Sequence, residues 1–309
     1  MATGDPLYEA FGEGATASRL GPVRGFGLSV EGFDLTLASS VDRFSEEAFE
    51  ALRQRVVAEG LVVFRNQNLG PVDQVALGRR FGELESLVVE GDDADPSMIV
   101  IGNVDESGET FADDDPRMKL MSINEGWHTD SSFREIPASF SIFSAQTLPP
   151  EGGDTFFASL QAAWDALSPQ EQTALYGRVG VHDYDAAYRL RGNSSGAAVG
   201  FNMPEVHHPL VRMHPETQRV GLYVSEHVSG VVGMEPEAAL GLLDLLIEVT
   251  TREEAVVRHT WLRGDVAIWD NRSMLHKAQG FDARYPRVMH HVRVAGGDAP
   301  IAAIPVAVG

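Results

Sequence analysis

The stretch "NEGWHTDSSF", residues 124–133, places an imidazole and a carboxylate two positions apart, at His128 and Asp130. Both are side chains that bind transition metals through nitrogen and oxygen. With ten His and 45 acidic residues in 309, random order would give 10 × 45/309, or about 1.5, His-x-Asp/Glu matches, and the sequence has two. The other, His214-Pro215-Glu216, lies in "HPETQR", which is predicted to be a hairpin turn. The spacing alone therefore does not establish a metal site.

A third ligand would make the pair chemically complete. An iron(II) oxygenase site needs two imidazoles and one carboxylate, with other metal positions left open. Residues two apart share a face of a strand, so His128 and Asp130 can point at one ion. His276 follows the predicted strand "DVAIWDNRSMLH" and begins a basic segment. We predict a metal-binding and catalytic triad of His128, Asp130 and His276, against the alternative that His276 is an ordinary interior or surface histidine.

The sequence contains no Cys. Any metal must therefore be bound by His, Asp and Glu, and these donors suit iron, manganese or zinc. Two other classes of protein stay open at this stage. The same three ligands could hold zinc and activate water for hydrolysis, or the fold could bind a ligand without chemistry.

The segment from Arg272 to Arg293 is basic in an acidic chain. It holds Arg272, Lys277, Arg284, Arg287 and Arg293 against Asp282, or 5 − 1 = +4, whereas the whole chain has a net charge of −21. The local excess indicates a small anionic ligand bound at short range, and the alternative is an ordinary solvated basic strand. The overall charge argues against nucleic acid and anionic membranes as partners.

The elements that must position these residues can be read from periodicity and turn signals. Ser45 is predicted to cap a helix that ends at Gly60, "LVVF" to form a buried strand, and Pro71 to begin a second helix. "ASFSIFSAQ" and "GGDTFFAS" are predicted strands, followed by one helix over "LQAAWDALSPQEQTALYGR". "EPEAALGLLDLLIEVTTREE" predicts another helix, and the final third alternates as antiparallel strands with "RGD" as a turn.

These patterns predict a mainly β protein with flanking helices. We expect a loose N-terminal arm over residues 1–25 and a single domain over 26–309, built as an antiparallel barrel or jelly roll with helices outside it. The acidic, turn-rich segment 90–117 is either a lid or a solvated loop. No apolar stretch approaches the roughly 18 residues of a membrane span, and no signal peptide is evident, so a cytoplasmic location is expected.

Three motifs in this order, "GWHTDSSF", "PPEGGDTFF" and "VAIWDNRSMLHKAQ…YPRVMHHVRVAG", resemble the taurine/dichlorophenoxyacetate dioxygenase (TauD/TfdA) family of iron(II)- and 2-oxoglutarate-dependent oxygenases. The resemblance extends from about Gly27 to Gly296 and implies a double-stranded β-helix (jelly roll). It implies His128, Asp130 and His276 as iron ligands, and Fe(II), 2-oxoglutarate and O2 as cofactors. In such enzymes 2-oxoglutarate is converted to succinate and carbon dioxide while a small-molecule substrate is hydroxylated.

The resemblance also implies how the cosubstrate is held. Thr155 in "GGDT" and Arg287, 287 − 276 = 11 residues beyond the distal His, match the pair that binds the far carboxylate of 2-oxoglutarate. The chemistry agrees, since a guanidinium binds a carboxylate through two parallel hydrogen bonds and Thr adds a hydroxyl donor. Without the other motifs, "GGDT" would read equally well as an ordinary turn into a strand. Asn124 matches a polar position that lines the family's substrate pocket.

The substrate is predicted from the strand "RVMHHVRV". Alternation places Arg287, Met289, His291 and Arg293 on one face, which points inward if Arg287 does. Sulfonate-cleaving members of the family carry a sulfonate-binding Arg where this chain has His291, and Arg293 resembles the phenoxyalkanoate-cleaving branch. We therefore expect a small carboxylic acid with an apolar or aromatic body near Asn124, Phe133 and Phe157. The alternatives are a sulfonate- or alkylsulfate-cleaving enzyme, and an Arg293 that pairs with an acidic neighbour at the barrel rim.

Overall fold

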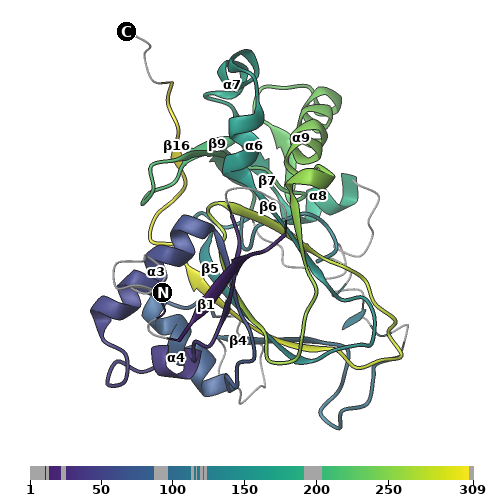
Figure 1. Ribbon diagram of the computed structural model, residues 1–309. Coiled ribbons are helices and arrows are strands. Elements are labelled where there is room, and N and C mark those ends of the chain that lie inside the picture. The colour runs from purple at the N-terminus through teal and green to yellow at the C-terminus, as the bar shows by residue number, and fades with distance from the viewer. Residues whose placement is uncertain are drawn as a thin grey trace.

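The computed structural model describes residues 11, 14–21, 26–86, 97–112, 115, 117–118, 121, 124–190 and 204–305. Within these residues the largest element is a seven-stranded sheet in the order β1-β2-β3-β13-β5-β15-β4 (Figure 1). Its strands are Thr16–Arg19 (β1), Leu28–Glu31 (β2), Leu61–Phe64 (β3), Val266–Asp270 (β13), Ala138–Thr147 (β5), Val288–Ala295 (β15) and Met98–Gly102 (β4). The inner strand β5 pairs antiparallel with both β13 and β15.

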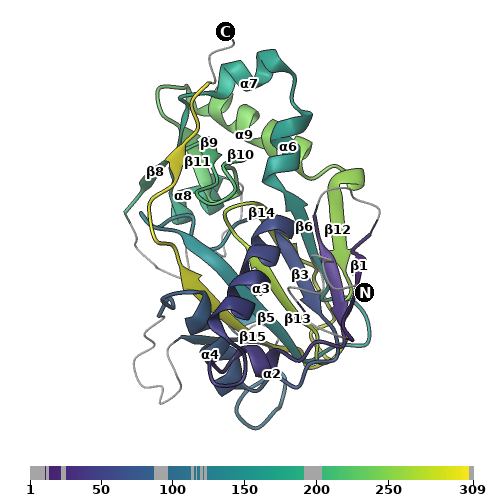
Figure 2. The ribbon, with the colours of Figure 1, turned by 60° about the vertical axis from the view of Figure 1, so that its left-hand side comes forward.

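Two long helices cover one face of this sheet (Figure 2). In α3, Glu46–Glu59, the Ser45 side chain accepts a hydrogen bond from the backbone N–H of Ala48, and Gly60 ends the helix with a φ of 69°. Helix α4, Pro71–Phe81, begins with its proline in the first turn. A short helix, Leu35–Ala38 (α2), lies beside α4. The apolar faces of α3 and α4 pack on the sheet in one buried cluster that includes Val292 and Val294 of β15.

A smaller sheet faces the large one. It consists of Val256–His259 (β12), Thr155–Ser159 (β6) and Met274–Ala278 (β14), with β6 in the middle. Two opposed sheets, antiparallel except for the parallel pair β2 and β3, with helices outside, form the double-stranded β-helix predicted from the sequence, and this fold class is confirmed.

The remaining elements gather in the upper part of the molecule as drawn in Figures 1 and 2. Their strands are Val179–His182 (β7), Val206–Pro209 (β8), Val211–Met213 (β9), Val220–Leu222 (β10), Val228–Val231 (β11) and Ile301–Ala302 (β16). Their helices are Leu160–Ala166 (α6), Pro169–Leu175 (α7), Tyr184–Leu190 (α8) and Pro236–Thr250 (α9), with a 3₁₀ turn at Glu253–Ala255 (η2).

Two sequence-based expectations about elements need correction. Residues Thr16–Arg19 lie inside the predicted loose arm, yet they form β1 in register with β2, because the backbone of that sheet edge offers hydrogen-bonding partners that composition cannot reveal. The single helix predicted over 160–178 is two helices. Ser168 forms a capping box with Glu171 and Pro169 occupies the first turn of α7, so the chain restarts there.

The segment proposed as a lid falls only partly within the described residues. Residues 87–96, 113–114 and 116 lie outside them, while Met98–Gly102 forms the edge strand β4. Among the helices of the described residues, none is long and apolar enough to cross a bilayer.

Candidate active site

A cavity of about 540 Å³ opens between the two sheets. Its wall is built by side chains from β4, β5, β13 and β15 of the large sheet and from β6 and β14 of the small one, together with the "HTDSSF" segment. The predicted ligands His128, Asp130 and His276 all line it, and so do Thr155 and Arg287. The fold therefore brings residues from distant parts of the sequence around one space.

The two histidines of the triad are joined through their backbones. His128 N–H donates to the carbonyl of His276 and His276 N–H donates to the carbonyl of His128, each at 2.9 Å. The ring centroids lie 4.2 Å apart. Nδ1 of His128 is 2.7 Å from the carbonyl oxygen of Gly126, which can only accept, so the ring proton lies on Nδ1 and the lone pair on Nε2. One ligand atom from each of His128, Asp130 and His276 lies within 4.8 Å of the others.

Burial sets the charge state of this group. Desolvation lowers the pKa of His276 well below its usual value, which keeps its imidazole neutral and its lone pair available. Burial would raise the pKa of the Asp130 carboxyl. That pKa is nevertheless held below its usual range by His276 and His291, which become cationic only in acid, and by the Arg293 guanidinium. Neutral imidazoles and an ionised carboxylate are the forms that bind a divalent cation, so the triad fits iron(II).

The Asp130 carboxylate is held by neighbours that sequence reasoning missed. Ser141 Oγ of β5 donates to Oδ2 of Asp130 at 2.6 Å, and the Asp130 backbone N–H donates to Oδ1 of Asn271 at 3.2 Å. Ser141 and Asn271 are almost completely buried. The next residue, Ser131, has a φ of 56°, so the chain turns sharply directly after the ligand.

Arg287 and Thr155 lie where a second acid could be bound. The Arg287 guanidinium is buried, its Nη2 donates to the carbonyl of Gly153 at 3.1 Å, and its Nε has no hydrogen-bonding partner among the described residues. Burial lowers the pKa of Arg287 to about 10, against the opposing charge of Asp154, so it stays protonated at neutral pH. Trp261 Nε1 donates to Thr155 Oγ at 3.0 Å, which leaves the Thr155 proton for another acceptor. A cation with an unused donor beside a free hydroxyl fits a carboxylate of 2-oxoglutarate.

The predicted substrate residues divide into two groups. Asn124, Phe133, His291 and Arg293 line the cavity. Phe157 does not: it is completely buried and stacks behind His276, with ring centroids 6.1 Å apart. Strand alternation places Phe157 on the same face as Thr155, but the rings of His276 and Trp269 cover it. The expectation that Phe157 contacts the substrate is corrected accordingly.

Arg293 has an acidic neighbour, as one of the alternatives predicted. Its Nε lies 3.3 Å from Oε2 of the buried Glu85, and its Nη1 donates to Ser131 Oγ at 3.3 Å. Arg134 Nη1 lies 3.9 Å from the other Glu85 oxygen and also lines the cavity. Two guanidinium groups thus share one carboxylate, which leaves a net charge of about 2 − 1 = +1 at this end of the cavity.

His291 lies beside the triad. Its Nε2 is 3.7 Å from Oδ2 of Asp130. Burial lowers the pKa of His291 to about 4, so it is neutral at physiological pH and offers no charge to an anion.

The other missed residues form the apolar wall. Ile99 and Ile101 of β4, Tyr184 of α8 and His227 join Phe133 around the cavity. The Phe133 ring packs edge-on against Tyr184, with centroids 5.0 Å apart. The strand signal of "MIVIGNV" was visible in the sequence. Its position at the cavity depends on pairing with β15, where Ile99 faces His291, 291 − 99 = 192 residues further on, and no local pattern encodes that.

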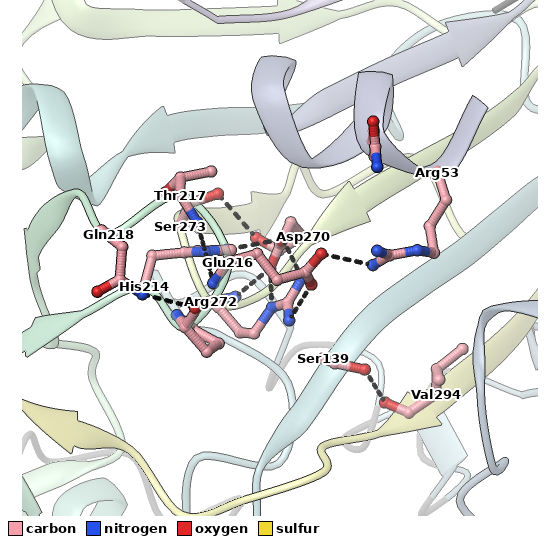
Figure 3. Close-up of polar contacts among 12 residues, drawn as sticks. Arg53, Ser139, His214, Glu216, Thr217, Gln218, Asp270, Arg272, Ser273 and Val294 are labelled. Atoms are coloured by element: carbon pink, nitrogen blue, oxygen red, sulfur yellow. Dashed lines mark hydrogen bonds and ion pairs between the residues drawn. The ribbon is translucent and has the colours of Figure 1, made fainter. Parts of the chain in front are cut away.

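Behind the site, a buried ionic network fixes the turn between β13 and β14 (Figure 3). Arg272 binds both oxygens of Asp270, and His214 Nε2 lies 3.0 Å from Oδ2 of Asp270. Arg272 Nη1 also contacts Glu216, which in turn pairs with Arg53 of α3. The His214-Pro215-Glu216 match, which was predicted to be a hairpin turn, is therefore structural: it joins β9 to β10 and anchors the "WDNR" turn.

Two imidazoles and one carboxylate inside a double-stranded β-helix, together with an arginine that has an unused donor, define a non-haem iron oxygenase of the two-His, one-carboxylate class. Residues 19–294 match the taurine catabolism dioxygenase TauD, TfdA family, and the chain belongs to it. The expectation of a 2-oxoglutarate-dependent iron dioxygenase that uses Fe(II), 2-oxoglutarate and O2 is confirmed over the zinc hydrolase.

Similar proteins cover most of the chain. An (S)-phenoxypropionate/alpha-ketoglutarate dioxygenase of Sphingobium herbicidovorans is 35% identical over 248 residues, 77% of this chain and 83% of that protein. An alpha-ketoglutarate-dependent 2,4-dichlorophenoxyacetate dioxygenase of Cupriavidus pinatubonensis is 34% identical over 264 residues, 83% of this chain and 90% of that protein. The crystal structure of AAD-2 in complex with Mn(II) and N-oxalylglycine has a TM-score of 0.79 and 28% identity, covering 94% of this chain and 99% of AAD-2.

Proposed function

We propose that this enzyme oxidises a small carboxylic acid with an apolar or aromatic body, at the carbon next to the acid group, in a reaction that consumes 2-oxoglutarate. The observation that carries the proposal is the pair Arg293 and Arg134, which line the same cavity as an apolar wall that includes Ile99 and Phe133. An acid with a hydrophobic body needs both features, and the relatives that act on phenoxyalkanoates add support.

When bound at His128, Asp130 and His276, Fe(II) with 2-oxoglutarate and O2 supplies the oxidising power that hydroxylates a C–H bond, with succinate and carbon dioxide as coproducts. The protein itself positions the ligands and excludes water. The backbone bridge between His128 and His276 fixes two ligands at one spacing. The sheets on both sides keep the ligand group largely buried, which excludes water from the reacting atoms.

The cosubstrate is assigned to Arg287 and Thr155. The unused Nε of Arg287 and the free hydroxyl proton of Thr155 would bind its far carboxylate. Gly153 leaves room for this arginine, since a Cβ there would lie 2.9 Å from Arg287 Nε. N-oxalylglycine in AAD-2 is a dicarboxylate of similar shape, which supports the assignment.

The substrate acid is assigned to Arg293, with Arg134 beside it. Glu85 holds the two guanidinium groups near each other, and their surplus positive charge attracts one anion. Asn124 and Phe133 would contact the substrate body. His291 occupies the position at which the resemblance puts a sulfonate-binding Arg. A neutral imidazole there argues against the alternative of a sulfonate- or alkylsulfate-cleaving enzyme.

If the attacked carbon carries an ether oxygen, the hydroxylated product is a hemiacetal and breaks down to release the alcohol or phenol. The proposal further includes a cytoplasmic location and self-association into a homo-oligomer. Cell fractionation and size-exclusion chromatography test these two in turn.

The central test is a substrate panel. Purified enzyme with Fe(II), 2-oxoglutarate and air is assayed for succinate with phenoxyacetate, 2-phenoxypropionate, alkanoates and their sulfonate counterparts. We expect succinate and oxidised product only with carboxylates, and none without oxygen. Product formed without O2, or sulfonates turned over as fast as matched carboxylates, would contradict the proposal.

A further inference from the structure

Asn271, in the turn after β13, makes contacts on every polar atom of its side chain. Its Oδ1 accepts from the indole Nε1 of Trp269 at 2.9 Å and from the backbone N–H of Asp130 at 3.2 Å. Its Nδ2 donates to Ser141 Oγ at 2.9 Å. Ser141 Oγ then donates to Oδ2 of Asp130 at 2.6 Å. The amide side chain therefore reaches Asp130 twice, once at the backbone and once through Ser141.

The direction of each hydrogen bond follows from chemistry alone. An indole N–H and a backbone N–H can only donate, so the oxygen of the Asn271 amide must face Trp269 and Asp130, and its NH2 group must face Ser141. The Ser141 hydroxyl accepts from that NH2 group, and its single proton is directed at the Asp130 carboxylate. The side chains of Asn271 and Ser141 therefore each have a single arrangement of donors and acceptors.

The backbone of Asn271 is fixed as firmly as its side chain. Its N–H donates to the carbonyl of Ser139 at 2.9 Å, and Arg212 Nη2 donates to its carbonyl at 2.8 Å. On either side stand Asp270 and Arg272, which the ionic network of Figure 3 joins to Glu216. Asn271 is 2% exposed and Ser141 is 0% exposed, so water does not compete for these bonds.

We propose that Asn271 and Ser141 are positioning residues that hold the Asp130 carboxylate in one orientation toward the metal. The proposal rests on the assignment of Asp130 as a metal ligand. A carboxylate on a turn with two rotatable side-chain bonds would otherwise lose conformational entropy whenever the ion binds, and here the protein has ordered it beforehand. Outer hydrogen bonds of this kind typically change metal affinity by about 10- to 100-fold.

The test measures Mn(II) binding to metal-free enzyme by calorimetry, so that the readout does not depend on turnover. Ser141→Ala should raise the Mn(II) dissociation constant about 10-fold or more, and should broaden the Mn(II) electron paramagnetic resonance spectrum as the ligand gains freedom. Ser144→Ala is the matched control, because Ser144 is a buried serine of the same strand whose hydroxyl donates to Gln74 at 2.7 Å. That control should bind Mn(II) within about 2-fold of wild type.

A second variant separates positioning from packing. Asn271→Leu keeps a similar volume but removes both contacts to Asp130, and it should weaken Mn(II) binding at least as much as Ser141→Ala. Both changes interrupt the same series of hydrogen bonds from Asn271 through Ser141 to Asp130. The loss of Mn(II) affinity in the double variant should therefore be smaller than the product of the two single losses. Urea unfolding of each metal-free variant shows whether the fold itself is preserved.

The outcomes are distinct. If wild type binds no Mn(II), or Asp130→Ala binds it unchanged, the metal-site assignment itself is wrong. If wild type binds Mn(II) through Asp130 but Ser141→Ala matches Ser144→Ala in affinity, the positioning role is wrong and the metal site stands. Strictly multiplicative losses of Mn(II) affinity in the double variant would also contradict a positioning role that Asn271 and Ser141 share.

Discussion

His128 and His276, 276 − 128 = 148 residues apart, exchange two backbone hydrogen bonds of 2.9 Å each, so the metal site is closed by the same bonds that hold β14 to the "HTD" segment. The spacing of the two imidazoles is therefore a property of the backbone. Side-chain changes at the site can remove a ligand without releasing this bridge.

The first prediction concerns the carboxylate of the triad. Asp130→Ala should abolish succinate formation and Mn(II) binding, because it removes one of three ligands. Circular dichroism should be unchanged, since the backbone bridge between His128 and His276 does not use the Asp130 side chain. Metal-dependent turnover at the wild-type rate in this variant would contradict the assignment of the three metal ligands.

The cosubstrate site is tested by a substitution that conserves charge. Arg287→Lys keeps a cation but loses the fork of parallel donors, so the apparent affinity for 2-oxoglutarate should fall about tenfold or more, as expected for charge-assisted bonds worth roughly 1.5–3 kcal/mol. Initial-rate kinetics at varied 2-oxoglutarate give the KM. Arg284→Lys is the control, since Arg284 is exposed and pairs with Asp282. Equal KM values in the two variants would argue decisively against this role of Arg287.

Gly153→Ala should impair the 2-oxoglutarate site by displacing Arg287. Gly153 has a φ of +72°, and a Cβ would come within 2.9 Å of Arg287 Nε and 3.2 Å of its Cδ. We expect a higher KM for 2-oxoglutarate with Mn(II) affinity preserved, because the metal ligands are not displaced. Gly177→Ala is also at a positive φ, +75°, but in open space, and it controls for backbone strain. If both variants change the KM equally, the steric argument fails.

The role of Arg293 in substrate binding can be distinguished from its ion pair with Glu85. Arg293→Ala should lower kcat/KM for carboxylate substrates by about 10- to 100-fold and leave the KM for 2-oxoglutarate within a factor of about two, since it removes a charged donor from the substrate end only. Glu85→Gln should strengthen binding of the acid, because it removes the competing negative charge. An unchanged kcat/KM in Arg293→Ala would mean that this arginine serves only the ion pair with Glu85.

One contribution to the pH dependence of folding comes from a residue away from the metal ligands. His182 is completely buried, and burial lowers its pKa well below the usual value of about 6.5. The unfolded chain then binds a proton that the folded chain does not, so the free energy of unfolding decreases as pH falls below about 6.5, by up to about 1.4 kcal/mol per pH unit. Above that pH this term is absent.

Urea unfolding of metal-free protein between about pH 7.5 and pH 5 measures that slope. His182→Phe keeps a ring against His208 and Tyr223 and removes the titration, so its slope should be shallower than that of wild type by about one proton. The lowered pKa values of Asp130 and Asp270 act only at lower pH. Parallel slopes for wild type and variant would contradict the assignment.

His128 and Asp130 could be predicted from a local signal, because they are two positions apart. His276 and Arg287 were predicted from the ordered motifs of the family resemblance. Ser141, Asn271 and Glu85 could not, because each reaches the site from an element whose position depends on strand pairing across long stretches of sequence.

Phe157 shows the opposite error. Its strand face was predicted correctly, but alternation says only which way a side chain points and not what lies in front of it. The rings of His276 and Trp269 fill that space. Depth within a barrel is a tertiary property, and no period in the sequence reports it.

Strand β4 stands at the end of the seven-stranded order and contributes Ile99 and Ile101 to the cavity, whereas the metal ligands, Ser141 and Thr155 stand on or against inner strands. Changes in β4 disturb one pairing partner, β15, and none of the hydrogen bonds around Asp130. Substitutions in β4 can therefore change which substrates fit the cavity while the metal ligands and their hydrogen bonds are kept. The same separation makes positions 99 and 101 the natural starting points for directed evolution toward other acids.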